Sequence, residues 1–106
     1  EVTRDFQKSI INYQKAADFD NKNAEAYFNL GNVYIKLDLR EKAWGAYLKA
    51  TEVNANHIDA WVNLSIMAFQ QKDYANAARF CDEAILLGYD APARYLQELA
   101  PYRENL

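Results

Sequence analysis

The sequence predicts an all-α protein built from antiparallel helical hairpins, and three observations support this prediction. The chain repeats itself, because AYFNLGNVY from residue 26 is matched by AWVNLSIMA from residue 60. In both copies, apolar residues recur at i, i+3, i+4 and i+7, the spacing of one helical face. The 106 residues include only three Gly and two Pro, which leaves little for tight turns between strands.

Six helices are expected, separated by short polar breaks. The expected helices cover residues 3–18, 24–37, 40–53, 58–71, 74–87 and 92–99. The breaks fall at residues 20–23, 38, 54–57, 72–73 and 88–90. Gly88 suits the left-handed position after a helix, and Pro92 suits the first turn of the next one. Such short connections permit only antiparallel neighbours.

The two copies share an order of residue types that fills a helical core. The shared order is an aromatic, Leu, a small residue and a Tyr or Ala, followed in the second helix by Ala, an aromatic or Cys, and Ala. In the first copy these are Tyr27, Leu30, Gly31, Tyr34, Ala43, Tyr47 and Ala50. In the second they are Trp61, Leu64, Ser65, Ala68, Ala77, Cys81 and Ala84. This order resembles the 34-residue tetratricopeptide repeat family.

The resemblance implies a right-handed superhelix of stacked hairpins, an α-solenoid, in a single domain over residues 1–106. Residues 1–19 resemble the second helix of a partial repeat, on the evidence of Phe6, Ser9, Tyr13 and Ala16. Two repeats are expected over 24–57 and 58–90, followed by a capping helix and tail over 91–106. Gly31 and Ser65 are expected where paired helices approach closely. The proline usual near the end of a repeat is replaced by Asn21 and Ala55.

A second face of each first helix is not needed for the core, and the resemblance implies that it lines a concave groove. In the first repeat this face carries Glu25, Phe28, Asn29, Asn32, Ile35 and Lys36. In the second it carries Asp59, Val62, Asn63, Ile66, Phe69 and Gln70. The carboxamides of Asn29 and Asn63 offer donors and acceptors to a partner's backbone, a use known in some superhelices of this family. The alternative is that Asn is a tolerated polar residue on a solvated face.

The predicted function is a non-enzymatic protein–protein interaction module that holds a peptide or helical segment of a partner in this groove. Another use of the family's fold clamps a C-terminal carboxylate with Lys or Arg on the concave face. Here Asp59 and Asn63 occupy those places, and Asp59 would repel a carboxylate. A neutral or basic segment is therefore the expected guest.

Self-assembly is the alternative function. The first helix lacks its hairpin partner and is expected to expose Phe6, Ile10 and Tyr13. Trp44 and Leu48 lie off the core stripe of their helix. Either Trp44 covers a neighbouring helix and Leu48 is a scattered apolar residue of the surface, or the two form a contact patch on the convex side.

Other classes of function find no support. The net charge of −3 argues against nucleic-acid binding. His57 lies alone in a loop and Cys81 replaces a core aromatic, so neither a metal site nor a nucleophile is expected, and no cofactor is implied. No membrane span or signal peptide is expected, and the single cysteine implies no oxidising compartment, which favours a soluble, cytoplasmic protein. The chain begins with Glu, which favours a processed protein or a segment of a longer one.

Overall fold

The computed structural model describes residues 2–19 and 23–103, and the chain divides into two compact units, Glu1–His57 and Ile58–Leu106. Every regular element among the described residues is a helix. The all-α prediction is therefore confirmed, and each unit is described separately below.

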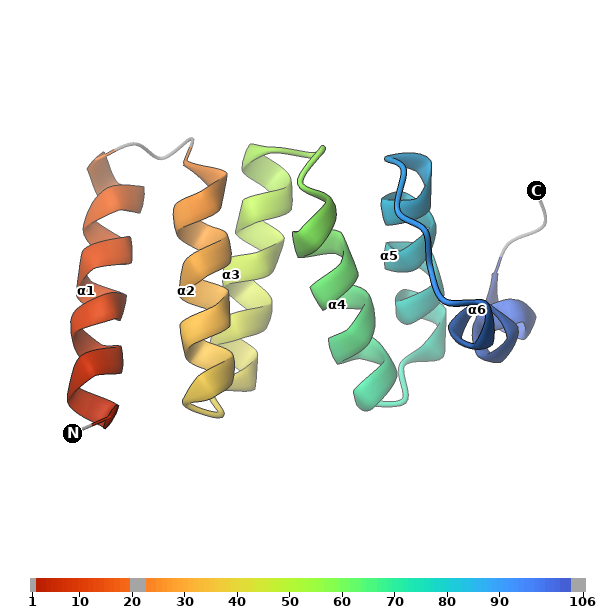
Figure 1. Ribbon diagram of the computed structural model, residues 1–106, viewed down its shortest axis with the longest axis horizontal. Coiled ribbons are helices and arrows are strands. Elements are labelled where there is room, and N and C mark those ends of the chain that lie inside the picture. Colours follow the sequence, from red (N-terminus) through yellow and green to blue (C-terminus); the bar gives the residue numbers. More distant parts are fainter. Residues whose placement is uncertain (1, 20–22, 104–106) are drawn as a thin grey trace. The chain divides into compact units, whose positions relative to one another are not determined.

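The first unit contains three helices, α1 (Val2–Phe19), α2 (Ala24–Lys36) and α3 (Arg40–Val53). Helix α2 lies between α1 and α3 and contacts both (Figure 1). Helix α2 begins after Asn23, whose Oδ1 accepts a hydrogen bond from the Ala26 N–H at 3.0 Å and so satisfies one of the free donors of the first turn. Most predicted core positions of α2 and α3 are buried, with Leu30 only 3% exposed, whereas Tyr27 and Tyr34 are half-buried.

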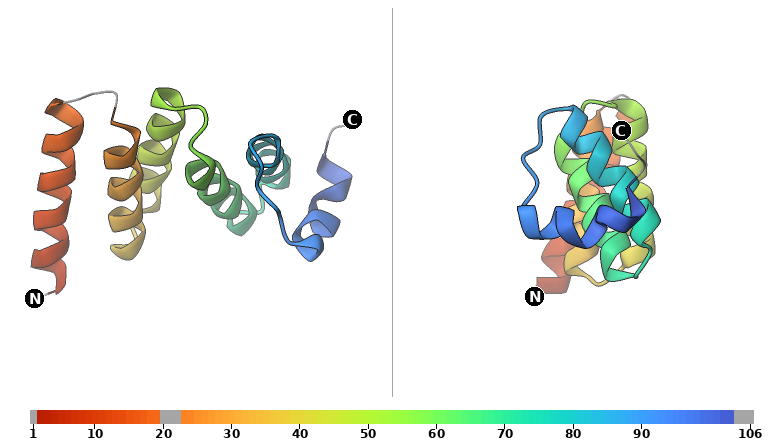
Figure 2. Two further views of the ribbon diagram at one scale, coloured as in Figure 1. Left: turned by 45° about the horizontal axis from the view of Figure 1, so that its top comes forward. Right: turned by 90° about the vertical axis from the view of Figure 1, so that its right-hand side faces the viewer.

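The second unit contains α4 (Ile58–Gln70), α5 (Tyr74–Leu86), α6 (Ala93–Leu99) and the 3₁₀ helix η1 (Ala100–Tyr102). Asp73 caps α5 by accepting a hydrogen bond from the Asn76 N–H at 3.3 Å. Helices α4 and α5 form a hairpin, whereas α6 runs across α5 instead of alongside it (Figure 2, right). The short helix α6 is therefore unlike the first helix of a further repeat.

Helices α2, α4 and α5 end in the same turn, with a left-handed residue just past the helix. The residues with positive φ are Asp38 (59°), Lys72 (64°) and Gly88 (108°). In each case the next N–H reaches back to a carbonyl of the last helical turn: Leu39 to Tyr34 at 2.8 Å, Asp73 to Ala68 at 2.9 Å, and Tyr89 to Ala84 at 3.0 Å. This is the Schellman arrangement, which satisfies the free carbonyls at a helix end. The left-handed role predicted for Gly88 is confirmed.

The close approach predicted at Gly31 is also confirmed. A Cβ built on Gly31 would lie 2.6 Å from Cδ1 of Tyr47 on α3, closer than atoms of real side chains approach one another. The equivalent Ser65 is 2% exposed, and its Oγ donates to the Ala77 carbonyl of α5 at 2.7 Å. In the first unit, Gly31 leaves the space that the Tyr47 ring occupies. In the second unit, the equivalent Ser65 forms a hydrogen bond between the two helices.

Other predictions need adjustment. The helix ends agree with those predicted to within one residue, but η1 was not anticipated, and Pro92 precedes α6 instead of starting it. Phe6, Ile10 and Tyr13 are half-buried, and α1 packs against α2. Among the α1 side chains whose burial the structure describes, the exposed large apolar ones are instead Ile11 and Phe19. Of the break predicted at residues 20–23, only Asn23 lies within the described residues.

Candidate functional site

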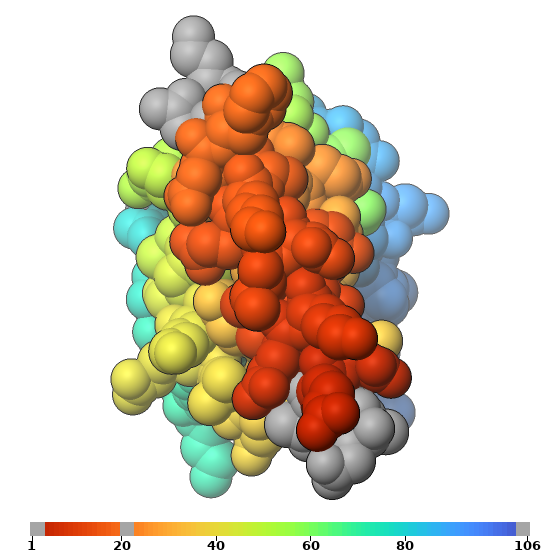
Figure 3. All heavy atoms as spheres, turned by 90° about the vertical axis from the view of Figure 1, so that its left-hand side faces the viewer, coloured from red at the N-terminus to blue at the C-terminus, as the bar shows by residue number. Residues whose placement is uncertain are grey.

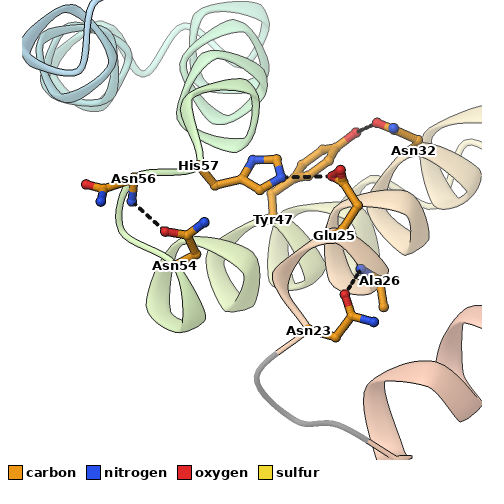
Figure 4. A network of polar contacts seen from close by, with 8 residues as sticks. All are labelled: Asn23, Glu25, Ala26, Asn32, Tyr47, Asn54, Asn56 and His57. Atoms are coloured by element: carbon orange, nitrogen blue, oxygen red, sulfur yellow. Dashed lines mark hydrogen bonds and ion pairs between the residues drawn. The ribbon is translucent and has the colours of Figure 1, made fainter.

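The predicted binding face of α2 is partly occupied by contacts within its own unit. Glu25 Oε1 lies 3.0 Å from Nε2 of His57, which follows α3 in the chain (Figure 4). The Phe28 ring lies against the rings of His57 and Tyr47, with centroids 4.8 and 5.6 Å apart. His57 is therefore not the isolated loop residue that the sequence suggested. Its contacts with Glu25 and Phe28 join the segment after α3 to α2.

Asn32 belongs to the same set of internal contacts. Its Oδ1 accepts a hydrogen bond from the Tyr47 hydroxyl at 2.6 Å (Figure 4). Tyr47 is 2% exposed, so this bond allows a phenol to be buried in the hairpin. Asn32 therefore supplies the acceptor that the buried Tyr47 hydroxyl needs.

The rest of the α2 face is turned outward. Ile35 is 38% exposed, and Lys36 is exposed beside it. Asn29 is half-buried, and its carboxamide makes no hydrogen bond within the part of the chain that the structure describes. Of the six predicted residues on this helix, Asn29 and Ile35 remain available to a partner, whereas Lys36 Nζ lies over the Phe6 ring of α1, 6.0 Å from its centroid.

The predicted face of α4 borders a pocket of about 140 Å³. Val62 and Ile66 are two of the α4 residues that line it, and Ile66 is 43% exposed. The remaining lining comes from α4, α5, the segment before α6, and α6 itself: Ser65, Cys81, Tyr89, Pro92 and Tyr95. Most of these side chains are apolar or aromatic, so the pocket suits an apolar group.

Two hydroxyls of this pocket, those of Ser65 and Tyr95, are bonded within the unit. The hydroxyls of Ser65 and Tyr95 lie 2.6 Å apart in a hydrogen bond, in addition to the bond from Ser65 to Ala77. Burial raises the pKa of the Tyr95 phenol above 10.0, while the hydrogen bond to Ser65 acts in the opposite direction. Burial, with the Asp82 charge nearby, likewise raises the pKa of the Cys81 thiol above 9.0. A thiol with a raised pKa is a poor nucleophile, which favours a packing role.

The other predicted residues of α4 differ in their surroundings. Asp59 and Gln70 are exposed near opposite ends of the helix, and Gln70 has a contact within the protein. Asn63 is half-buried and also makes a contact within the protein, so it differs from Asn29. Phe69 lies away from the pocket lining, and its ring packs against Tyr74 and Tyr95 with both centroid distances at 5.3 Å.

The outward side of α3 is less exposed than an open contact patch would be. Trp44 and Leu48 are both half-buried, and Trp44 makes a contact within the protein. Leu48 also accepts a hydrogen bond at its carbonyl from the Thr51 hydroxyl at 2.7 Å. The contact patch on the convex side stays a prediction.

The described residues lack two further features. Within residues 2–19 and 23–103, no three His, Cys, Asp or Glu side chains are grouped to hold a metal ion. Over the same residues, no helix is both long enough and apolar enough to cross a membrane.

Comparison with known proteins identifies the family. Residues 5–38 match the family described as TPR repeat, and residues 24–57 match the family described as Tetratricopeptide repeat. The chain belongs to the tetratricopeptide repeat family. The crystal structure of MamA has the same fold with a TM-score of 0.75, at 23% identity over 81% of this chain and 50% of that one. The α-solenoid fold class predicted from the repeat is thereby confirmed.

The curated proteins that the chain matches are much longer than the chain. The chain is 34% identical over 61 residues to Protein O-mannosyl-transferase TMTC3 of Homo sapiens, which is 58% of this chain and 7% of that protein. It is 33% identical over 67 residues to Stress-induced-phosphoprotein 1 of Caenorhabditis elegans, 63% of this chain and 21% of that protein. It is 28% identical over 86 residues to Anaphase-promoting complex subunit 3 of Schizosaccharomyces pombe, which is 81% of this chain and 13% of that protein. The chain thus spans about a fifth or less of the length of these relatives.

Family membership defines the general class of function. Tetratricopeptide repeats are protein–protein interaction modules and are in general not enzymes. The chain is accordingly a module that binds other proteins.

Proposed function

We propose that this module binds a peptide or helical segment of a partner protein, with contacts on the outer face of α4 in the second unit and, considered separately, on the outer face of α2 in the first. The observation that carries the proposal is the pocket bordered by Val62 and Ile66, because it places an apolar recess beside a half-exposed aliphatic side chain. An apolar side chain of the partner that enters the recess would be removed from water. Such anchors supply much of the affinity at protein interfaces.

The carboxamides add hydrogen bonding to this apolar contact. Asn29 has unused donors and acceptors on α2, and a carboxamide such as Asn63 has more than one donor and acceptor site. Either can bind a backbone amide of the partner whatever its side chains are. The asparagines would therefore contribute affinity, while the pocket would contribute the preference for an apolar residue.

Charge favours a neutral or basic partner segment. The α4 face carries the exposed Asp59, and the whole chain has a net charge of −3. Like charges brought together at an interface weaken binding and slow association. A segment rich in Asp or Glu is therefore disfavoured on this face.

A pair of matched variants tests the pocket. Ile66→Asp places a charge at the pocket, whereas Leu86→Asp places the same charge at an aliphatic residue of α5 that is 81% exposed and outside the pocket lining. Capture of partners by the wild-type module, quantified by mass spectrometry, should identify proteins lost with Ile66→Asp and retained with Leu86→Asp. Equal capture by both variants would show that the pocket is not the binding site.

A second pair of variants tests the asparagines on each helix separately. Asn29→Ala and Asn63→Ala should leave the helical circular dichroism unchanged and lower the affinity for a partner defined by the first experiment. Removal of one or two hydrogen bonds corresponds to roughly a 3- to 10-fold loss for each variant. Unchanged affinity in the double variant would contradict a role for the carboxamides.

Self-association is a second candidate, and exposed apolar residues on α1 favour it. Phe19 is 95% exposed and Ile11 is 52% exposed. Figure 3 shows α1 foremost, with no other described helix in front of it. Light scattering over a dilution series, repeated with Phe19→Ser, tests this function: a mass that falls on dilution, and falls further in the variant, would support it. A monomer at all concentrations would exclude it for this chain.

A further inference from the structure

A second recess in the Ile58–Leu106 unit is built from aromatic rings. Phe69 of α4, Tyr74 of α5 and Tyr102 of η1 line it together with Glu98 of α6, and its volume is about 230 Å³. These four residues come from four different elements, so the recess exists only because α6 and η1 return to the α4–α5 hairpin.

The rings meet at an angle and are not stacked flat. Phe69 and Tyr74 have centroids 5.3 Å apart and an interplanar angle of 67°, and Tyr74 and Tyr102 have centroids 5.2 Å apart and an angle of 36°. Two rings at a steep angle form adjoining walls. Each face of an aromatic ring is electron-rich and attracts a cation placed over it.

The walls are held in place by contacts behind them. The Phe69 ring packs on Tyr95, which is tied to the buried Ser65 by the 2.6 Å hydrogen bond. Next to Tyr102, Arg103 Nε donates to Asp82 Oδ1 of α5 at 2.8 Å, with both side chains about one quarter exposed. The recess is therefore prepared before any ligand arrives, which lowers the ordering cost of binding.

Glu98 adds a negative charge to the aromatic walls. Its side chain is 46% exposed, and Arg94, one helical turn earlier, places Nε 3.6 Å from Glu98 Oε1. Arg94 is itself 91% exposed, so this ion pair is weak and easily exchanged. A carboxylate beside ring faces is a suitable environment for an organic cation, and the weakly held Arg94 can give way to one.

We propose that this recess binds the side chain of a lysine or arginine presented by a partner protein. The cation would lie against the ring faces of Phe69 and Tyr74, pair with Glu98, and be covered at its edge by Tyr102, which is 47% exposed. The recess differs from the pocket beside Val62 and Ile66. The inference does not depend on the function proposed above, because the two recesses have different linings and a small cationic probe tests this one alone.

The test uses the whole chain and small probes. Nα-acetyl-arginine N-methylamide is compared with its citrulline analogue, which has nearly the same shape but no charge. NMR titration of the aromatic and backbone signals should show saturable shifts at Phe69, Tyr74 and Tyr102 with the arginine probe. The citrulline analogue should bind about 3- to 30-fold more weakly, the range expected for a cation over aromatic faces.

Variants at exposed positions separate the recess from general charge effects. Glu98→Gln should weaken binding of the arginine probe at least 3-fold, whereas Glu83→Gln, which removes an exposed carboxylate of α5 outside the recess, should not. Tyr102→Leu should also weaken it, and because Tyr102 is nearly half exposed the variant is expected to fold. Arg94→Ala should strengthen binding by releasing Glu98.

Three results would overturn the proposal. These are equal affinity for the arginine and citrulline probes, no saturable shift at the recess up to the solubility limit of the arginine probe, and equal loss in Glu98→Gln and Glu83→Gln. Failure here would leave the Ile66→Asp experiment unaffected, because that experiment reads partner capture at a different pocket.

Discussion

The packing of Gly31 against Tyr47 makes a quantitative prediction about one added methyl group. Gly31→Ala places a Cβ into the Tyr47 ring, which lies 2.6 Å away at Cδ1 and 2.8 Å away at Cζ. The ring has little freedom to yield, because Tyr47 is 2% exposed and its hydroxyl is bonded to Asn32. Overpacking of this kind costs about 1–3 kcal/mol.

Two further effects act with opposite signs. Alanine is a better helix former than glycine by about 1 kcal/mol. Displacing the Tyr47 ring weakens its hydrogen bond to Asn32, which costs about 1 kcal/mol. These effects nearly cancel, so Gly31→Ala should lower the free energy of unfolding by about 1–3 kcal/mol.

Gly45→Ala is the matched control, since Gly45 lies within α3 and a Cβ there would meet nothing within 4 Å. It should raise the free energy of unfolding by about 0.5–1 kcal/mol. Urea denaturation followed by circular dichroism at one protein concentration would measure both. In a Tyr47→Leu background, which removes the ring, most of the penalty at Gly31 should disappear. The reasoning is refuted if Gly31→Ala and Gly45→Ala stabilise the protein alike.

Three other predictions follow from the turns and the α6 junction. Lys72 and Gly88 each have a positive φ, which glycine adopts without strain and other residues do not. In urea denaturation, Lys72→Gly should therefore stabilise the protein by about 0.5–1 kcal/mol, and Gly88→Ala should destabilise it by a similar amount. A change in the free energy of unfolding of the same sign in both variants would contradict this. Ser65→Ala should cost about 1–3 kcal/mol in the same assay, since the Ala77 carbonyl and the Tyr95 hydroxyl lose a buried partner; a loss near zero would show that neither bond matters. The raised pKa of Tyr95 means that the folded state holds the phenol proton more tightly than the unfolded state does. The contribution of this protonated phenol to the free energy of unfolding is therefore complete below pH 10.0 and is lost as the pH rises further. Tyr95→Phe should therefore flatten the fall in stability above that pH, and an unchanged slope would exclude Tyr95 as its source.

The hairpins were predictable because their packing is local and repeated. Leu30 and Leu64 are buried at the same place in two copies, and one spacing therefore predicts both. The helix ends followed from the same pattern, since the polar breaks interrupt the apolar stripe. The division into repeats at 1–19, 24–57, 58–90 and 91–106 stays a prediction, as does the groove that the first helices are expected to form.

The polar contacts were not predictable from the sequence. Helical periodicity assigns a residue to one face of its helix, but it does not say which side chains of other segments form hydrogen bonds with that residue. Glu25 was assigned to a binding face, yet it meets His57, a loop residue 32 positions away. Asn32 was assigned to the same face, but it lies at its edge and reaches Tyr47 on the neighbouring helix. Asn29 and Asn63 occupy equivalent positions and nevertheless differ in their internal contacts.

The fold of α6 could not be read from the repeat pattern. Tyr95 occupies the position of the aromatic that begins a repeat, but a helix of seven residues cannot form the usual hairpin. Its hydroxyl instead finds Ser65, and its ring finds Phe69. Both recesses of this unit depend on these contacts of α6 with the α4–α5 hairpin.

The serine at position 65 has a consequence for the engineering of such repeats. A designer who restores family residues one by one would replace Ser65 by Gly, matching Gly31 of the preceding copy. The exchange would fit sterically, but it would remove the hydroxyl that is bonded to Ala77 of α5 and Tyr95 of α6. Tyr95 lines one recess and packs on the Phe69 wall of the other. Idealising this repeat would thus remove the very feature that distinguishes it from its neighbour.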